Sequence, residues 1–156
     1  MKISGITHVG VVVSSLEDSV KFFKDVMGLK LISEPDNPEK PDLEEAKGIG
    51  LDYCWSRFCV FEAGPGHILE LMEFKEPKSS IDKPIKRYDL GQHHISFTVD
   101  NIDEWTAKFD KEKIEYFYRP VTCGPGIFEG IKWIYFKGPD GIVFELMEKP
   151  KGFNKF

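Results

Sequence analysis

The sequence lacks both a long hydrophobic run and an excess of basic residues. Its 21 Lys and Arg residues stand against 26 Asp and Glu residues, which gives a formal net charge of −5. Non-specific binding of DNA or RNA needs a dense basic surface, which this acidic composition does not favour. The apolar stretch within residues 1–15 is too short to span a membrane, and no small-residue cleavage site follows it. We therefore expect no nucleic-acid partner, no membrane association and no export signal.

Cysteine is also scarce. The three residues Cys54, Cys59 and Cys123 contain no C-x-x-C pair and cannot form an even set of disulfides. Reduced thiols in a cytoplasmic protein are the simplest interpretation. Apolar sequence is not scarce, since 41% of the 156 residues are hydrophobic and 30% are charged. This is the balance of an ordinary globular domain that can bury a core.

The most informative feature that is present is an internal repeat. The stretch HVGVVVSSLEDSVKFF from His8 resembles HISFTVDNIDEWTAKF from His94. Further along, FEAGPGHILELME from Phe61 resembles FKGPDGIVFELME from Phe136, and both end in Glu-Leu-Met-Glu. The spacing between the two similar stretches is longer in the first copy. The chain therefore consists of two copies of one unit, the first with an insertion.

Each copy predicts the same order of elements. A strand with alternating apolar residues precedes a helix, which begins after Ser14 or Ser15 in one copy and after Asn101 in the other. Another extended segment follows, at residues 29–34 and 115–118, and then a hairpin closed by a Gly-Pro turn. Each copy therefore reads as β-α-β-β-β.

The boundaries follow from these patterns. We expect one domain, with module one at residues 3–74, a linker at 75–92, module two at 93–149 and a tail at 150–156. The insertion at about 35–56 is either a partly helical flap over a site or an inert surface loop. The linker carries several basic residues, among them Lys83, Lys86 and Arg87, mixed with acids. It is either a solvated connection or an anion-binding segment.

Four residues stand in equivalent places of the two copies. Residues two apart in a strand share a face, so packing of the apolar positions against the helix turns His8 and His94 away from it. The same alternation turns Glu70 and Glu145 to that face in the last strands. Each His alone reads as an ordinary half-buried residue and each Glu as a solvated one. Together, two imidazoles and two carboxylates on one concave surface are a plausible set of ligands for a divalent metal.

The repeat and its motifs resemble a known family. H-V-G-V and H-H-I-S-F-T-V-D-N-I-D open the modules and E-L-M-E closes them. In this the chain is similar to the vicinal oxygen chelate superfamily of glyoxalases, bleomycin resistance proteins and dioxygenases. The nearest members in motif are glyoxalase I-like and methylmalonyl-CoA epimerase-like proteins. The resemblance implies an α+β fold in which two tandem βαβββ modules form a half-open mixed β-barrel.

The same resemblance implies a site and a chemistry. His8, Glu70, His94 and Glu145 would bind a divalent metal ion, which is Zn, Fe, Ni, Co or Mn. The metal would chelate vicinal oxygens of a small oxygenated substrate and stabilise a developing enolate. Glu145, or otherwise Glu70, would act as general base. This describes an epimerase, an isomerase or a glyoxalase-like lyase. A ring-cleaving Fe(II) or Mn(II) dioxygenase and a binding protein that sequesters an antibiotic without turnover are the alternatives.

Several features stay open at this stage. Trp133 and Tyr135 share a strand face that either lines the pocket or packs on a helix. His93 is expected to be structural and His67 to be exposed in a hairpin turn. The glycine-rich loop at 122–130, preceded by Arg119, is either a lid or a static turn. We also expect a homodimer.

Overall fold

We describe a computed structural model of the chain, in which residues 2–81 and 86–156 are described. Part of the expected linker, residues 82–85 with Lys83, lies outside the described residues. The chain divides into two compact units, residues 1–82 and 83–156. The boundary between them falls within the linker that the repeat predicts, and each unit holds one copy of the repeat.

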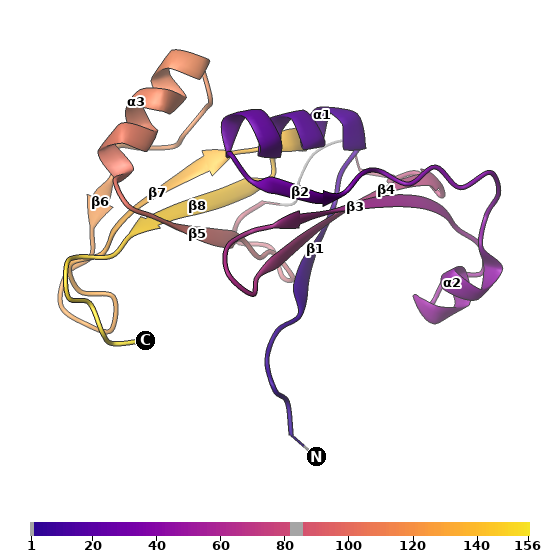
Figure 1. Cartoon of the computed structure of the whole chain (residues 1–156), viewed down its shortest axis with the longest axis horizontal. Coiled ribbons are helices and arrows are strands. Elements are labelled where there is room, and N and C mark those ends of the chain that lie inside the picture. Colours follow the sequence, from indigo (N-terminus) through magenta and orange to yellow (C-terminus); the bar gives the residue numbers. More distant parts are fainter. Residues whose placement is uncertain (1, 82–85) are drawn as a thin grey trace. The chain divides into compact units, whose positions relative to one another are not determined.

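Unit one is a four-stranded mixed sheet with a helix against it (Figure 1). Its elements are β1 (His8–Val12), α1 (Leu16–Lys21), a π-helical segment (Phe22–Val26), β2 (Lys30–Ser33), α2 (Leu43–Gly48), β3 (Trp55–Glu62) and β4 (Ile68–Glu76). The strand order is β1-β4-β3-β2, with β1 parallel to β4 and the other pairs antiparallel.

Unit two repeats this plan. Its elements are β5 (Ile95–Val99), α3 (Ile102–Glu112), β6 (Val121–Thr122), β7 (Lys132–Lys137), a 3-10 turn (Pro139–Gly141) and β8 (Val143–Glu148). The order β5-β8-β7-β6 matches that of unit one, again with a parallel first pair. The prediction of two βαβββ modules is thus confirmed. The extended segment expected at 115–118 does pair with β7, since Tyr116 bridges Phe136 and backbone hydrogen bonds join Glu115 to Lys137 and Phe117 to Tyr135, but the named strand β6 follows it at Val121–Thr122.

Both helices begin at polar caps and bury an apolar stripe. Ser15 accepts a hydrogen bond from the backbone N–H of Asp18, and Asn101 accepts bonds from those of Asp103 and Glu104, so their first turns are satisfied. Each stripe then packs on aromatic residues of its own sheet. The ring centroids of Phe23 and Phe61 lie 5.9 Å apart in unit one, and those of Phe109 and Phe136 lie 4.8 Å apart in unit two. Burial of each such ring stabilises the fold by about 2–3 kcal/mol.

The last residue of each Glu-Leu-Met-Glu sequence ties the helix start to the last strand. In unit one the carboxylate of Glu73 accepts the backbone N–H of Leu16 at 3.1 Å. In unit two Glu148 accepts that of Ile102 at 2.8 Å. A carboxylate at a helix N-terminus is favourable because the free N–H groups carry partial positive charge.

A basic residue on the neighbouring strand completes this arrangement in both units. Arg57 of β3 lies 3.4 Å from Glu73 and 2.6 Å from Glu17. Lys132 of β7 takes the same place beside Glu148 and Asp103. These contacts lie on the helix side of each sheet. Because strand residues three apart point to opposite faces, they leave Glu70 and Glu145 on the other side.

The insertion of unit one contains the short helix α2, which begins at the cap Asp42. It is tied to the start of β3: the indole N–H of Trp55 donates to the Pro38 carbonyl and the Ser56 hydroxyl donates to Glu45. Trp55 pairs with Glu76 at the far end of β4 from Glu70, about 20 Å along the strand. In Figure 1, α2 lies beyond that end of the sheet. A covering role for this segment over a site stays a prediction.

In the described parts of the chain, no helix combines the length and the apolar character that crossing a bilayer requires.

Candidate metal and substrate site

In unit one, the structure brings His8 and Glu70 together on the sheet face opposite α1. They lie on neighbouring parallel strands, β1 and β4, where Glu70 pairs with Gly10. His8 Nε2 is 3.7 Å from Glu70 Oε2, and the two side chains are 49% and 26% exposed. A Cβ added at Gly10 would lie 3.4 Å from this carboxylate and 3.0 Å from Met72 Cε. Glycine therefore gives the Glu70 side chain the room to lie across β1 toward His8.

In unit two, His94 and Glu145 form the equivalent pair. Glu145 of β8 pairs with Ser96 of β5, so His94 again stands two residues before the partner of the glutamate. His94 Nε2 is 3.4 Å from Glu145 Oε2. Here the carboxylate is much less accessible, since the side chain of Glu145 is only 7% exposed against 38% for His94.

Both pairs suit a metal ion as donor sets. Nitrogen and oxygen ligands at 2.0–2.2 Å from one ion and at right angles lie about 3 Å apart, so small rotations of the side chains bring either pair to that spacing. Neither unit, within the described parts of the chain, gathers three or more His, Cys, Asp or Glu side chains into one group. Each unit by itself therefore offers two ligands, which is too few for a protein metal site.

Tyr135 extends the pair of unit two. It lies on β7 opposite Glu145, and its Oη is 3.3 Å from His94 Nε2. The two rings meet edge to face, with centroids 5.1 Å apart. Trp133 contacts Tyr135 on the same side of the sheet. The strand face that carries Trp133 and Tyr135 therefore lies on the His94 side of the sheet and does not pack against α3. Burial raises the pKa of the Tyr135 phenol, and the hydrogen bond with Arg87 lowers it by less. The hydroxyl thus keeps its proton at neutral pH.

Arg87 is a functional candidate that the sequence patterns did not single out. It belongs to the basic segment that leads into β5, and its guanidinium carbon lies 3.8 Å from the centroid of the Tyr135 ring. This is a cation–π contact at close range. The charge patterning of the linker hinted at an anion site, but a single sequence does not show which of its basic residues reaches the sheet.

The remaining candidates lie elsewhere in unit two or on the surface. His93 and His67 are both exposed, and His93 Nδ1 is 3.3 Å from the Gly91 carbonyl oxygen. Lys155 of the tail contacts the glycine-rich loop by donating to the Gly126 carbonyl at 2.6 Å and pairing with Glu129 at 3.2 Å. These contacts fit the static alternative for the loop better than a lid.

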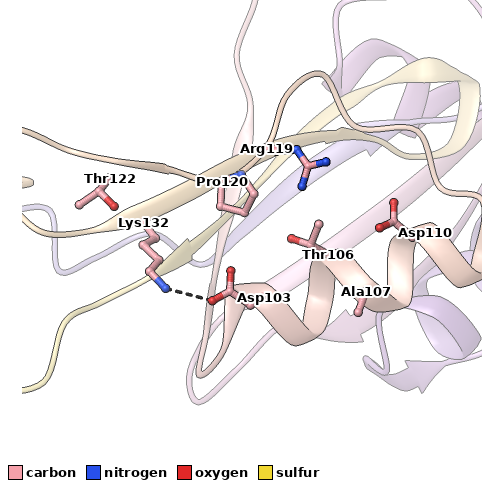
Figure 2. Close-up of a pocket in the computed structure, with 8 residues that line it drawn as sticks. All are labelled: Asp103, Thr106, Ala107, Asp110, Arg119, Pro120, Thr122 and Lys132. Atoms are coloured by element: carbon pink, nitrogen blue, oxygen red, sulfur yellow. Dashed lines mark hydrogen bonds and ion pairs between the residues drawn. The ribbon is translucent and has the colours of Figure 1, made fainter.

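Arg119 lines a pocket of about 430 Å³ between α3 and the chain that leads into β6. Figure 2 shows this pocket, whose lining includes the ion pair of Asp103 and Lys132, with Arg119 above Thr106 of the helix. Lys132 points to the α3 side of β7, whereas Tyr135 points to the opposite side. The pocket is therefore separate from the His94–Glu145 pair.

Comparisons with known proteins agree with this architecture. The chain is 28% identical over 150 residues to a 2-epi-5-epi-valiolone epimerase from Actinomyces sp, covering 94% of this chain and 80% of that protein. It resembles a glyoxalase family protein of Bacillus cereus with a TM-score of 0.78 and 24% identity, covering 95% of each chain.

A fosfomycin resistance protein of Listeria monocytogenes, in complex with Mn(II) and 1S,2S-dihydroxypropylphosphonic acid, has a TM-score of 0.59 and 20% identity over 96% of both chains. The sequence model of the Glyoxalase/Bleomycin resistance protein/Dioxygenase superfamily matches residues 5–146. This match spans both units, so the chain belongs to that superfamily.

Proposed function

We propose that this protein is a divalent-metal-dependent enzyme that moves a proton at a carbon beside a carbonyl group of a small oxygenated substrate, as an epimerase, isomerase or glyoxalase-like lyase does. His8 and Glu70 from unit one and His94 and Glu145 from unit two would be the ligands. The observation that carries the proposal is the identical diagonal placement of a His and a Glu in both units, at 3.7 and 3.4 Å.

The donor set argues for this chemistry. Two imidazoles and two carboxylates leave about two of six octahedral positions for vicinal substrate oxygens. When bound, the ion supplies Lewis acidity that makes the neighbouring C–H more acidic. A facial triad of two His and one carboxylate, which oxygenases use, would leave one of the two glutamates without a role.

The chain's own groups supply the proton transfer. Glu145 is the preferred base, because its carboxylate is nearly buried and thus shielded from water. Proton transfer by a positioned carboxylate contributes about 10²- to 10⁴-fold to the rate. Glu70 is the alternative. The epimerase relative from Actinomyces supports proton chemistry at carbon for this chain.

Solvent deuterium exchange tests the proposal. Protein loaded with Mn²⁺, Co²⁺ or Zn²⁺ is incubated in D₂O with a panel of hydroxyketones and 2-oxo acids, including 2-epi-5-epi-valiolone, and exchange is followed by proton NMR. We expect exchange that requires the metal and is lost in Glu145→Gln. Oxygen uptake with catechols would favour the dioxygenase instead. Tight ligand binding that Glu145→Gln leaves unchanged, without exchange, would favour a sequestering protein.

The ligand set also needs both pairs to reach one ion, within one chain or across a homodimer. Sedimentation of the metal-loaded protein, compared with mixtures of His8→Ala and His94→Ala chains, separates these two arrangements. Recovery of metal binding in the mixture identifies the arrangement across a dimer, because only there can one chain supply the ligand that the other lacks.

A further inference from the structure

A positive charge, Arg87, stands beside the metal-ligand candidates of unit two. In the described residues, no Asp or Glu lies within ion-pairing distance of Arg87, and its close neighbour is the Tyr135 ring. Lys132, Lys137 and Lys155 of the same unit each pair with a carboxylate at the surface. Arg87, which is also exposed, differs from these basic residues in its neighbour.

The contact with Tyr135 fixes the position of this charge. A flat guanidinium whose carbon lies 3.8 Å from a ring centroid rests on the face of that ring. The edge of the same ring meets His94, and its hydroxyl lies 3.3 Å from His94 Nε2. Arg87 thus stands one aromatic ring away from the His94–Glu145 pair.

The described residues of unit one show no counterpart of this arrangement. Val60 occupies on β3 the place that Tyr135 occupies on β7, since each is paired with the site glutamate of its unit. An aliphatic side chain offers neither a hydroxyl nor a face for a guanidinium. A ligand group that needs positive charge and hydrogen-bond donors is thus favoured beside unit two.

We propose that Arg87 and the Tyr135 hydroxyl form an oxyanion subsite next to His94 and Glu145, so that the substrate carries a carboxylate or a phosphate-type group close to its chelating oxygens. This inference rests on the proposed function and names its substrate class. Arginine suits either group, because its N–H fork matches two oxygens of a carboxylate or a phosphate. The Tyr135 hydroxyl supplies one further hydrogen-bonding group beside the guanidinium.

Three small probes that share vicinal oxygens test the subsite. Pyruvate carries a carboxylate, acetylphosphonate carries a phosphonate, and pyruvamide is neutral. Each is titrated calorimetrically into Mn²⁺-loaded and into metal-free protein, with the metal content of every sample measured. The variants are Arg87→Gln and Arg87→Lys, and Lys86→Gln is the matched control, because Lys86 is the neighbouring cation and lies over Tyr88 instead.

We expect Arg87→Gln to weaken the binding of at least one anion about tenfold, the effect of losing one charge-assisted interaction, and to leave pyruvamide and Mn²⁺ binding unchanged. The anion affected more tells whether the subsite prefers carboxylate or phosphonate. Lys86→Gln should bind like the wild type and Arg87→Lys should lie in between, because lysine keeps the charge but loses the fork.

Equal affinity of wild type and Arg87→Gln for both anions, including no measurable binding by either, overturns the subsite. The subsite is also overturned if Arg87→Gln weakens pyruvamide binding as much as anion binding, or if Lys86→Gln weakens anion binding as much as Arg87→Gln does. If Mn²⁺ does not bind but the anions still depend on Arg87, the metal-dependent function fails and the subsite stands. If Mn²⁺ binds and anion binding does not depend on Arg87, the subsite fails and the metal-dependent function stands.

Discussion

The two units share a backbone plan and a His–Glu pair but differ in what surrounds the pair. In unit one, Gly10 and Val60 are the neighbours of Glu70, and neither offers a polar side chain. In unit two, Ser96 and Tyr135 stand beside Glu145, and Arg87 lies on the tyrosine. The comparison teaches that the two copies keep the His and Glu positions alike while the neighbouring residues diverge.

This difference suggests that the two His–Glu pairs have different roles. A pair with small, apolar neighbours suits ligation alone. A pair with a buried carboxylate, a phenol and a guanidinium suits substrate orientation and proton transfer as well. The predictions below set matched positions of the two units against each other.

The largest difference is expected between the two glutamates. Glu145→Gln should lower the rate of metal-dependent deuterium exchange by about 10²- to 10⁴-fold, because it removes the preferred base. Glu70→Gln should cost less, since it removes a ligand only. The rates are compared at saturating metal, so that weaker metal binding does not mask the chemistry. Equal losses, or a larger loss at Glu70, would contradict these different roles.

Thiol reactivity compares the interiors of the two units. Burial raises the pKa of Cys59 in unit one to about 11, so only about 0.1% of it is thiolate at pH 8. Cys123 of unit two is half-buried. Iodoacetamide at pH 8 should modify Cys123 at least about tenfold faster than Cys59, as peptide mass spectrometry would show.

The labelling of Cys59 should also rise steeply with pH up to about 11, because the reactive thiolate increases as the pH approaches that pKa. Labelling in urea is the control, since unfolding should bring both residues to the same rate. Fast labelling of Cys59 in the native protein at pH 8 would contradict the buried placement.

The third comparison concerns the basic residue that supports each helix start. Arg57→Gln should destabilise the protein by about 3 kcal/mol, because Arg57 is buried and its loss leaves Glu73 with only Lys75, at 3.9 Å, as a neighbouring cation among the described residues. Lys132→Gln in unit two should have a smaller effect, since Lys132 is more exposed. Urea unfolding measures both, and equal effects would contradict the comparison.

The pH dependence of this contact has a definite sign. The hydrogen bond from Arg57 holds the pKa of Glu17 below its ordinary value of 4.5. A lowered pKa in the folded state gives stability that is present above the unfolded pKa and lost as the pH falls through the folded one. The difference in the free energy of unfolding between wild type and Arg57→Gln should therefore become smaller below about pH 4.5. A difference that grows there would contradict the assignment.

The smallest effect is expected at the residues opposite the glutamates. Gly10→Ala places a methyl group 3.4 Å from the Glu70 carboxylate and 3.0 Å from the mobile end of Met72, so we expect metal affinity to fall only a few-fold. Ser96→Ala in unit two removes an exposed hydroxyl and should leave the affinity unchanged. Calorimetric titration with Mn²⁺ compares the two, and a larger loss for Ser96→Ala would reverse the comparison.

Much of the fold could be predicted because it is repeated. Alternation in two related strands and the caps Ser15 and Asn101 depend on local sequence, so one chain was enough to find them. The short β6 was not predicted, because a two-residue edge strand has too little pattern of its own. The face of Tyr135 was left open, although its pairing with Glu145 across the hairpin fixes it.

The site could be predicted less completely, for physical reasons. The first Glu of each Glu-Leu-Met-Glu sequence was assigned to the site, but the last one, Glu73 or Glu148, was not assigned, although its repetition was the signal for a shared role at the helix start. Arg87 depends on how the chain before β5 folds back onto the sheet, and no periodicity encodes such a tertiary contact.

The most direct test of the account is the metal content of the protein purified without chelator, measured by elemental analysis for wild type, His8→Ala and His94→Ala. We predict roughly one transition-metal ion per chain in the wild type and a clear loss in both variants, because each unit would supply two of four ligands. Less than about a tenth of an equivalent in the wild type, with no binding on titration, would contradict the central claim. Metal content that is insensitive to either histidine would contradict it equally.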